Sequence, residues 1–191
     1  LASKAHESLR STSSKALYRQ VLNAGLSLRE RASDFPSAPE ELASRIDALL
    51  AAATRRATYI GELEAFVHEH PPHDLYETIQ RTDALIAKEE DSDRVQELIE
   101  TKTRSANLLA TVDERHHDLA HQHQRMLDVL TRLRQMEQQL SPDHRPEDRA
   151  FDQVSVILGD LATELDLSDA SRGEQEVAPA LLAAQTVSAS S

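Results

Sequence analysis

The clearest pattern in this sequence is the recurrence of apolar residues at alternating intervals of three and four positions. This spacing places apolar side chains on one face of an α-helix. One such series runs from Leu42 to His70, with Arg56 as a charged interruption, and a longer one runs from Val95 to Leu140. The pattern therefore predicts a chain of amphipathic helices.

Five helices are expected, and their ends coincide with capping residues or prolines. Ser37 and Glu40 form a capping box before the second helix, and Asp74 with Glu77 forms another before the third. Pro71 ends the second helix, because the residue before a proline leaves helical space. The predicted helices cover residues 15–33 (with a start near Ser3 as the alternative), 38–70, 74–86, 93–140 and 146–165.

The acidic run at residues 89–93 lies between the third and fourth predicted helices. It contains neither Gly nor Pro, so we expect the two helices to be continuous through it. The alternative is a break, with Asp93 and Gln96 as a new cap pair.

Short connections between these helices imply antiparallel neighbours. The expected fold is all-α: an elongated antiparallel helical bundle with coiled-coil-like packing over residues 1–167, with one very long helix. The periodic pattern fades from Ser168 onward, so residues 168–191 are expected to form a mobile tail.

The middle of the helix at 93–140 is longer than its neighbours can cover, and an apolar helix face without cover usually marks an interface. We expect this face to bind a second copy of the chain, as a homodimer, or another protein. A neighbouring column, formed by Ile99, Ala106, Ala120 and Leu127, widens the apolar face. The expected interface residues, called the central seam below, are Leu109, Val112, His116, Leu119, His123, Met126 and Leu130.

Composition and charge limit the classes of molecule that this chain is expected to bind. The formal net charge of −12 argues against nucleic acid or an anionic membrane surface as a partner. Residues 1–33 are net basic and residues 146–176 net acidic, which permits the two segments to meet, although both also suit solvated faces. The absence of cysteine excludes thiol catalysis and fits a reducing compartment, so a cytoplasmic location is expected.

The apolar runs are too short to cross a bilayer, which needs about 20 residues, so no membrane insertion is expected. The sequence begins with Leu1 rather than Met, so we expect it to be a piece or a processed form of a longer chain.

Histidine is frequent, and two clusters merit attention. Glu114, His117 and His121 fall on the outer face of the long helix, at the spacing that holds zinc or a similar ion. The alternative is an exposed His pair with only incidental, weak affinity for metal. His68 and His70 lie at the end of the second helix, where imidazole caps carbonyl groups.

No nucleophile, base and acid appear together in a catalytic pattern, and no cofactor motif is present, so a non-enzymatic function is expected. Residues 10–15 form a run of hydroxyl residues flanked by basic ones, which is either a phosphorylation site or a frayed, solvated segment. The sequence thus favours a helical interaction or scaffold protein. The alternative is a metal-binding or pH-responsive bundle, in which His116 and His123 become charged as the pH falls.

Overall fold

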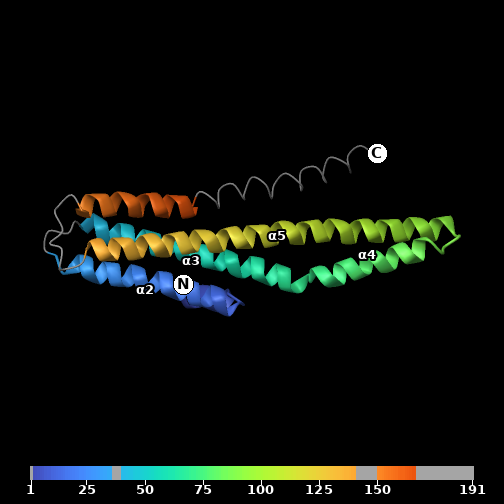
Figure 1. The fold of residues 1–191 in the computed structure, drawn as a ribbon, viewed down its shortest axis with the longest axis horizontal. Coiled ribbons are helices and arrows are strands. Elements are labelled where there is room, and N and C mark those ends of the chain that lie inside the picture. The colour runs from blue at the N-terminus through green and yellow to red at the C-terminus, as the bar shows by residue number, and fades with distance from the viewer. Residues whose placement is uncertain (1, 36–39, 141–149, 167–191) are drawn as a thin grey trace, which may run out of the picture. The chain divides into compact units, whose positions relative to one another are not determined.

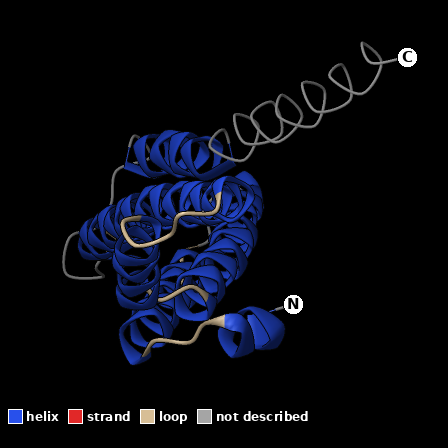
Figure 2. Ribbon diagram, turned by 90° about the vertical axis from the view of Figure 1, so that its right-hand side faces the viewer, coloured by secondary structure: helices blue, strands red, loops and turns tan. Residues whose placement is uncertain are grey.

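The computed structural model describes residues 2–35, 40–140 and 150–166, and every regular element among them is an α-helix (Figures 1 and 2). The all-α prediction is thereby confirmed. The helices are α1 (Ala2–Ser8), α2 (Thr12–Ser33), α3 (Glu40–Glu69), α4 (Pro72–Ile86), α5 (Ser92–Gln139) and a further helix at residues 150–166.

The chain forms two compact units. Unit 1 contains Leu1–Ala16 and Ala57–Gln124, and unit 2 contains Leu17–Arg56 and the described residues from Arg125 onward. Three helices, α2, α3 and α5, contribute residues to both units.

Unit 2 is a packed arrangement of four helical segments, from α2, α3, α5 and residues 150–166 (Figure 1). Phe35 and Phe151 meet edge to face, with ring centroids 5.6 Å apart. Glu137 of α5 accepts a hydrogen bond from Ser27 and forms an ion pair with Arg31, both on α2. The fully buried core includes Val21, Leu28, Leu42, Ile46, Leu49, Leu133, Val154 and Leu158.

Unit 1 contains α1, the first residues of α2, the last part of α3, α4 and the first two thirds of α5. Here α4 runs antiparallel beside the beginning of α5 (Figure 1). An ion pair between Asp83 and Lys102, at 2.5 Å, joins the two helices. The α4 residues that face α5, Leu75, Ile79 and Ile86, are only half-buried, because two helices cannot enclose a core between them.

The expected continuity between α4 and α5 is wrong. The helix stops at Ile86, and α5 begins with Asp91 as its N-cap. The Asp91 carboxylate accepts the N–H of Asp93 at 3.0 Å, and its carbonyl accepts the N–H of Val95 at 2.9 Å. A side-chain cap therefore supports the break without Gly or Pro, and Asp91 takes the role that the alternative gave to Asp93.

Two other predicted starts also differ. Asp74 is not an N-cap: α4 begins at Pro72, and Pro71 precedes it without a side-chain cap. Proline is already shaped for the first helical position, so the helix starts earlier and Asp74 joins its first turn. The start near Ser3 is interrupted, because α1 and α2 are separate helices joined by Leu9–Ser11.

The limits of α3 and α5 agree with the predicted ranges 38–70 and 93–140 to within two residues. The capping residue Ser37 and the tail at 168–191 lie outside the described residues.

Candidate functional site

The densest polar contact in unit 1 surrounds the carboxylate of Glu64, on α3. Ser11 and Ser14, at the start of α2, and His123, on α5, complete this group, which we call the Glu64 cluster. Ser14 Oγ donates to Glu64 Oε1 at 2.5 Å and lies 2.5 Å from His123 Nε2. Glu64 Oε2 accepts the backbone N–H groups of Arg10, at 2.6 Å, and Ser11, at 3.1 Å.

Local sequence explains how the serines reach this position. Ser11 is the N-cap of α2: its carbonyl accepts the N–H of Lys15 at 3.1 Å, and its hydroxyl accepts the N–H of Ser14 at 3.0 Å. In a capping box, a glutamate three residues along the helix would bond back to the N-cap N–H. Here Ser14 occupies that place, and Glu64 from α3 supplies the carboxylate instead.

Counting protons in the cluster assigns the direction of each bond. Ser11 donates its hydroxyl proton to Ser14 Oγ at 2.7 Å, and Ser14 donates its own to Glu64. Ser14 Oγ therefore has only lone pairs left for His123. The imidazole must carry its proton on Nε2 and donate it to Ser14.

Glu64 is ionised in spite of its burial, with only 8% of the residue exposed. Burial by itself raises the pKa of this carboxyl, but the hydrogen bonds from Ser14 and Ser11, and from the N–H groups of Arg10 and Ser11, outweigh it. The net effect is a pKa below the ordinary value of 4.5. The cluster is thus a buried anion held directly by three donors, the Ser14 hydroxyl and the N–H groups of Arg10 and Ser11.

This arrangement suits attachment rather than nucleophilic chemistry. Ser14 is 3% exposed, so a substrate has no access to its hydroxyl. A general base must accept the serine proton, whereas His123 donates a hydrogen bond to Ser14 and the Ser14 hydroxyl donates one to the buried Glu64 carboxylate. The cluster joins the start of α2 to α3 and α5, and no catalytic triad is formed by these residues.

Close backbone contact fixes α1 beside the same stretch of α3. Gly61 faces the carbonyl of Ser8, and a Cβ at this position would lie 2.7 Å from that oxygen. Ala5 and Leu9 are buried, at 2% and 1% exposure. The α1 segment is therefore held by small-residue packing at Gly61 and by polar contacts at Glu64.

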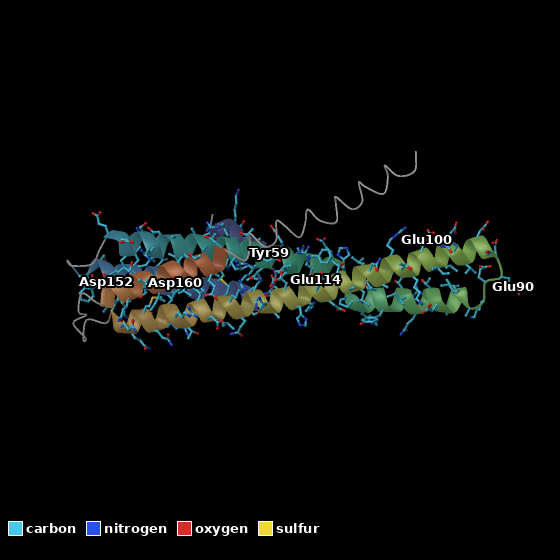
Figure 3. All side chains as sticks on the ribbon, turned by 90° about the horizontal axis from the view of Figure 1, so that it is seen from above. Tyr59, Glu90, Glu100, Glu114, Asp152 and Asp160 are labelled. Carbon is cyan, nitrogen blue, oxygen red and sulfur yellow. The ribbon has the colours of Figure 1, made fainter. Side chains whose placement is uncertain are left out.

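A second polar contact lies further along the same two long helices. The hydroxyl of Tyr59, on α3, donates to Asp118 Oδ2, on α5 (Tyr59 is labelled in Figure 3). Gln122 donates to the other carboxylate oxygen of Asp118 at 2.7 Å. Partly buried polar pairs of this kind fix the register between helices, because a shift by one turn would leave them unpaired.

The predicted metal ligands are not brought together. Glu114, His117 and His121 are all exposed on α5, where Figure 3 labels Glu114. Among the residues that the structure describes, no group of three or more His, Asp or Glu side chains is placed to hold a metal ion.

The central seam is divided between burial and exposure. Leu109, Val112, Met126 and Leu130 are buried within the chain, so its own helices cover them. Leu119 and His123 are half-buried, and His116 is exposed.

The apolar face widens on the side of α5 opposite to the one expected. Ile99 and Leu127 of the predicted neighbouring column are 41% and 45% exposed. The column that packs instead contains Gln122, Val129 and Met136, all buried. Because Gln122 is polar, this column does not stand out as apolar in the sequence. The position of the neighbouring helices decides which side of α5 is covered.

The expected capping role at the end of α3 is confirmed for His70. Its Nδ1–H donates to the carbonyl of Phe66 at 3.0 Å, and the two rings stack with centroids 4.7 Å apart. The guanidinium of Arg115, on α5, lies 5.8 Å from the Phe66 ring centroid. Such a contact between a cation and an aromatic ring supports the corner between α3 and α4.

Glu64 itself was missed at the level of sequence. It sits beside Ile60 and Leu63 in the apolar series of α3, and a charged residue at the edge of such a face usually reaches solvent. The signal in the sequence was the run of hydroxyl residues at 11–14. If this run begins a helix, its hydroxyl and N–H groups need a hydrogen-bond acceptor.

Comparison of the chain with protein-family models, characterised proteins and solved structures finds no match. No helix in the described part of the chain has the length and apolar character needed to span a membrane.

Proposed function

We propose that the chain is a non-enzymatic helical interaction protein of the cytoplasm that binds a second copy of itself through the α4–α5 hairpin, residues 72–108. One observation carries the proposal: the apolar seam between α4 and α5 is left half-exposed along this hairpin. The same helix α5 is well covered further on, where Val112 and Met126 are buried.

The seam of the hairpin has the composition of a helix-packing surface. Val95 and Leu98 of α5 are half-buried like the facing residues of α4, and Thr82 is the one residue of α4 that is buried. A two-helix hairpin gains little from such partial burial, since hydrophobic stabilisation is about 25 cal/mol per Å² removed from water. A second hairpin packed against the first would complete a four-helix arrangement.

Large apolar side chains flank this seam on the outside of the hairpin. Tyr76 and Leu85 of α4 and Ile99 of α5 are 52%, 50% and 41% exposed. A second hairpin stacked on one face of the first would cover those side chains that lie on that face, and in a symmetric homodimer each covered residue is used twice.

The proposed interface lies nearer the start of α5 than the central seam that the sequence predicted. The central seam begins at Leu109, whereas the uncovered part of the helix precedes it. The helix and the coiled-coil-like mode of binding remain those expected from sequence.

Sedimentation equilibrium of the whole chain tests the proposal. We expect a concentration-dependent dimer that is weakened at least tenfold by Ile99→Glu or Leu85→Glu, because each places a charge in the interface. Leu26→Glu is the matched control, since Leu26 is 47% exposed on α2 in unit 2. A chain that stays monomeric at all concentrations, or a dimer that only Leu26→Glu weakens, would show that the hairpin is not the interface.

A further inference from the structure

We propose that Ser11 is a phosphorylation site and that its modification releases α1 from α3. The inference rests on three features of unit 1. The hydroxyl residues 11–14 are flanked by basic residues, the buried carboxylate of Glu64 binds the N–H of Ser11, and the short helix α1 is attached through this contact. It is independent of the proposed self-association through the hairpin.

The helix α1 depends on its attachments. It spans only seven residues, Ala2–Ser8, and isolated helices of this length are not stable in water. Its connection to α2 is held at Glu64, which binds the N–H groups of Arg10 and Ser11. Loosening that contact therefore removes one of the two attachments of the segment before Thr12, the other being the packing of α1 at Gly61.

The residues around Ser11 suit a kinase that prefers basic substrates. Arg10 precedes Ser11 directly, and Lys15 follows the hydroxyl run. Arg10 is exposed, with its guanidinium 3.7 Å from the Glu69 carboxylate at the surface. Ser11 is half-buried in the only non-helical segment between α1 and α2, so a local opening of the short α1 presents it in an extended form.

The chemistry needs a nucleoside triphosphate as the phosphoryl donor. Ser11 Oγ attacks the γ-phosphorus and loses its proton to the kinase base, and the bond from the γ-phosphorus to the bridging oxygen breaks as the nucleoside diphosphate leaves. The product carries close to two negative charges. It also loses the hydroxyl proton that Ser11 gives to Ser14 Oγ.

The charge then opposes the contact that holds α1. The Ser11 N–H is 3.1 Å from Glu64 Oε2, and its side chain is one hydrogen bond away from Ser14, which donates to Glu64 Oε1. Two anions in this partly buried space repel each other, and the Arg10 guanidinium is paired with Glu69 at the surface.

Substitutions separate the effect of charge from that of capping. Asp and Asn cap helices as well as Ser does and are nearly equal in size, so Ser11→Asp and Ser11→Asn differ in charge and in the N–H groups of the amide. Tryptic cleavage after Arg10 reports release, because the scissile bond contains the Ser11 N–H that Glu64 holds. We expect cleavage to be about tenfold faster in Ser11→Asp than in Ser11→Asn, since the aspartate places a second negative charge beside the Glu64 carboxylate.

Two further variants serve as controls for this experiment. Ser13→Asp places the same charge two residues away, on an exposed side chain in the first turn of α2, and is expected to leave cleavage unchanged. Glu64→Gln combined with Ser11→Asp removes the repulsion and is expected to bring the rate back to that of Glu64→Gln. Equal rates for the Asp and Asn variants, or equal acceleration by Ser13→Asp, would overturn the proposal.

The modification itself is tested on the full chain with ATP and a basophilic serine/threonine kinase, followed by tandem mass spectrometry. Phosphate on Ser11, together with accelerated cleavage after Arg10 in the phosphorylated fraction, supports the proposal. Phosphate confined to other residues, or a chain carrying genetically encoded phosphoserine at position 11 that is cleaved no faster than the parent, contradicts it.

Discussion

Gly61 of α3 and Ser8 of α1 approach so closely that a methyl group between them has no room. A Cβ built on Gly61 would lie 2.7 Å from the Ser8 carbonyl oxygen and 2.8 Å from its carbon. These are backbone atoms, so rotation of a side chain cannot relieve the overlap.

Replacing Gly61 by Ala is therefore expected to displace α1 while α3 stays helical. The alanine favours the helix by about 1 kcal/mol, whereas the overlap costs roughly 1–3 kcal/mol. Hydrogen exchange over residues 2–10 should become faster in this variant. Gly25→Ala serves as control, because the obstruction there is the flexible side chain of Leu50. Unchanged exchange over residues 2–10 in Gly61→Ala would contradict the prediction.

Replacing Glu64 by Gln should lower the free energy of unfolding at neutral pH and alter its dependence on pH. The folded pKa of Glu64 is lower than the ordinary value of 4.5, so the unfolded chain binds the proton more tightly. The stability contributed by the ionised carboxylate is present above 4.5 and is lost as the pH falls through the folded pKa.

Urea unfolding of the parent and of Glu64→Gln, between about pH 3 and 7 and thus on both sides of the ordinary carboxyl pKa, measures this effect. The difference between the two chains should be largest at neutral pH and should shrink below 4.5. A difference that is constant across this range would mean that ionisation of Glu64 does not contribute to stability.

In unit 2, truncation of Leu49 to Ala is expected to cost about 2–5 kcal/mol, the usual range for a buried leucine. Leu49 is fully buried on α3. The same truncation at Leu26, which is 47% exposed on α2, should cost less than about 0.5 kcal/mol. Chemical denaturation followed by circular dichroism compares the two, and equal losses would show that the face of α3 has been misassigned.

Zinc titration of the whole chain by calorimetry is expected to show no tight stoichiometric binding. Glu114, His117 and His121 are exposed, and no group of potential ligands converges among the described residues. His117→Ala and His121→Ala should leave the titration curve unchanged. A single tight site that either substitution abolishes would support the metal-binding hypothesis instead.

Much of the fold was predictable because helix periodicity is a local property. The three-and-four spacing located α3 and α5 to within two residues, and Pro71 marked the corner after α3. The break before α5 was missed because Asp91, a capping residue in a run of acids, ends the continuity without any Gly or Pro. Where two helix starts compete, the choice depends on small differences in capping, of about 1 kcal/mol.

The candidate site was not predictable in the same way. Ser14 and Glu64 are separated by 50 positions, and Ser14 and His123 by 109, so no local pattern relates them. Their meeting depends on how α2, α3 and α5 pack.

Periodicity along a single chain is thus enough to say that residues form helices and which stripe of each is apolar, because both follow from 3.6 residues per turn. The side on which that stripe widens, toward Gln122 and Met136 rather than Leu127, is chosen by the neighbouring helices. The same holds for Glu64, whose carboxylate is stable in the interior only because Ser14, Ser11 and two backbone N–H groups from a distant segment surround it. An isolated helix leaves such a group to water, and tertiary packing alone brings it the donors that replace that water.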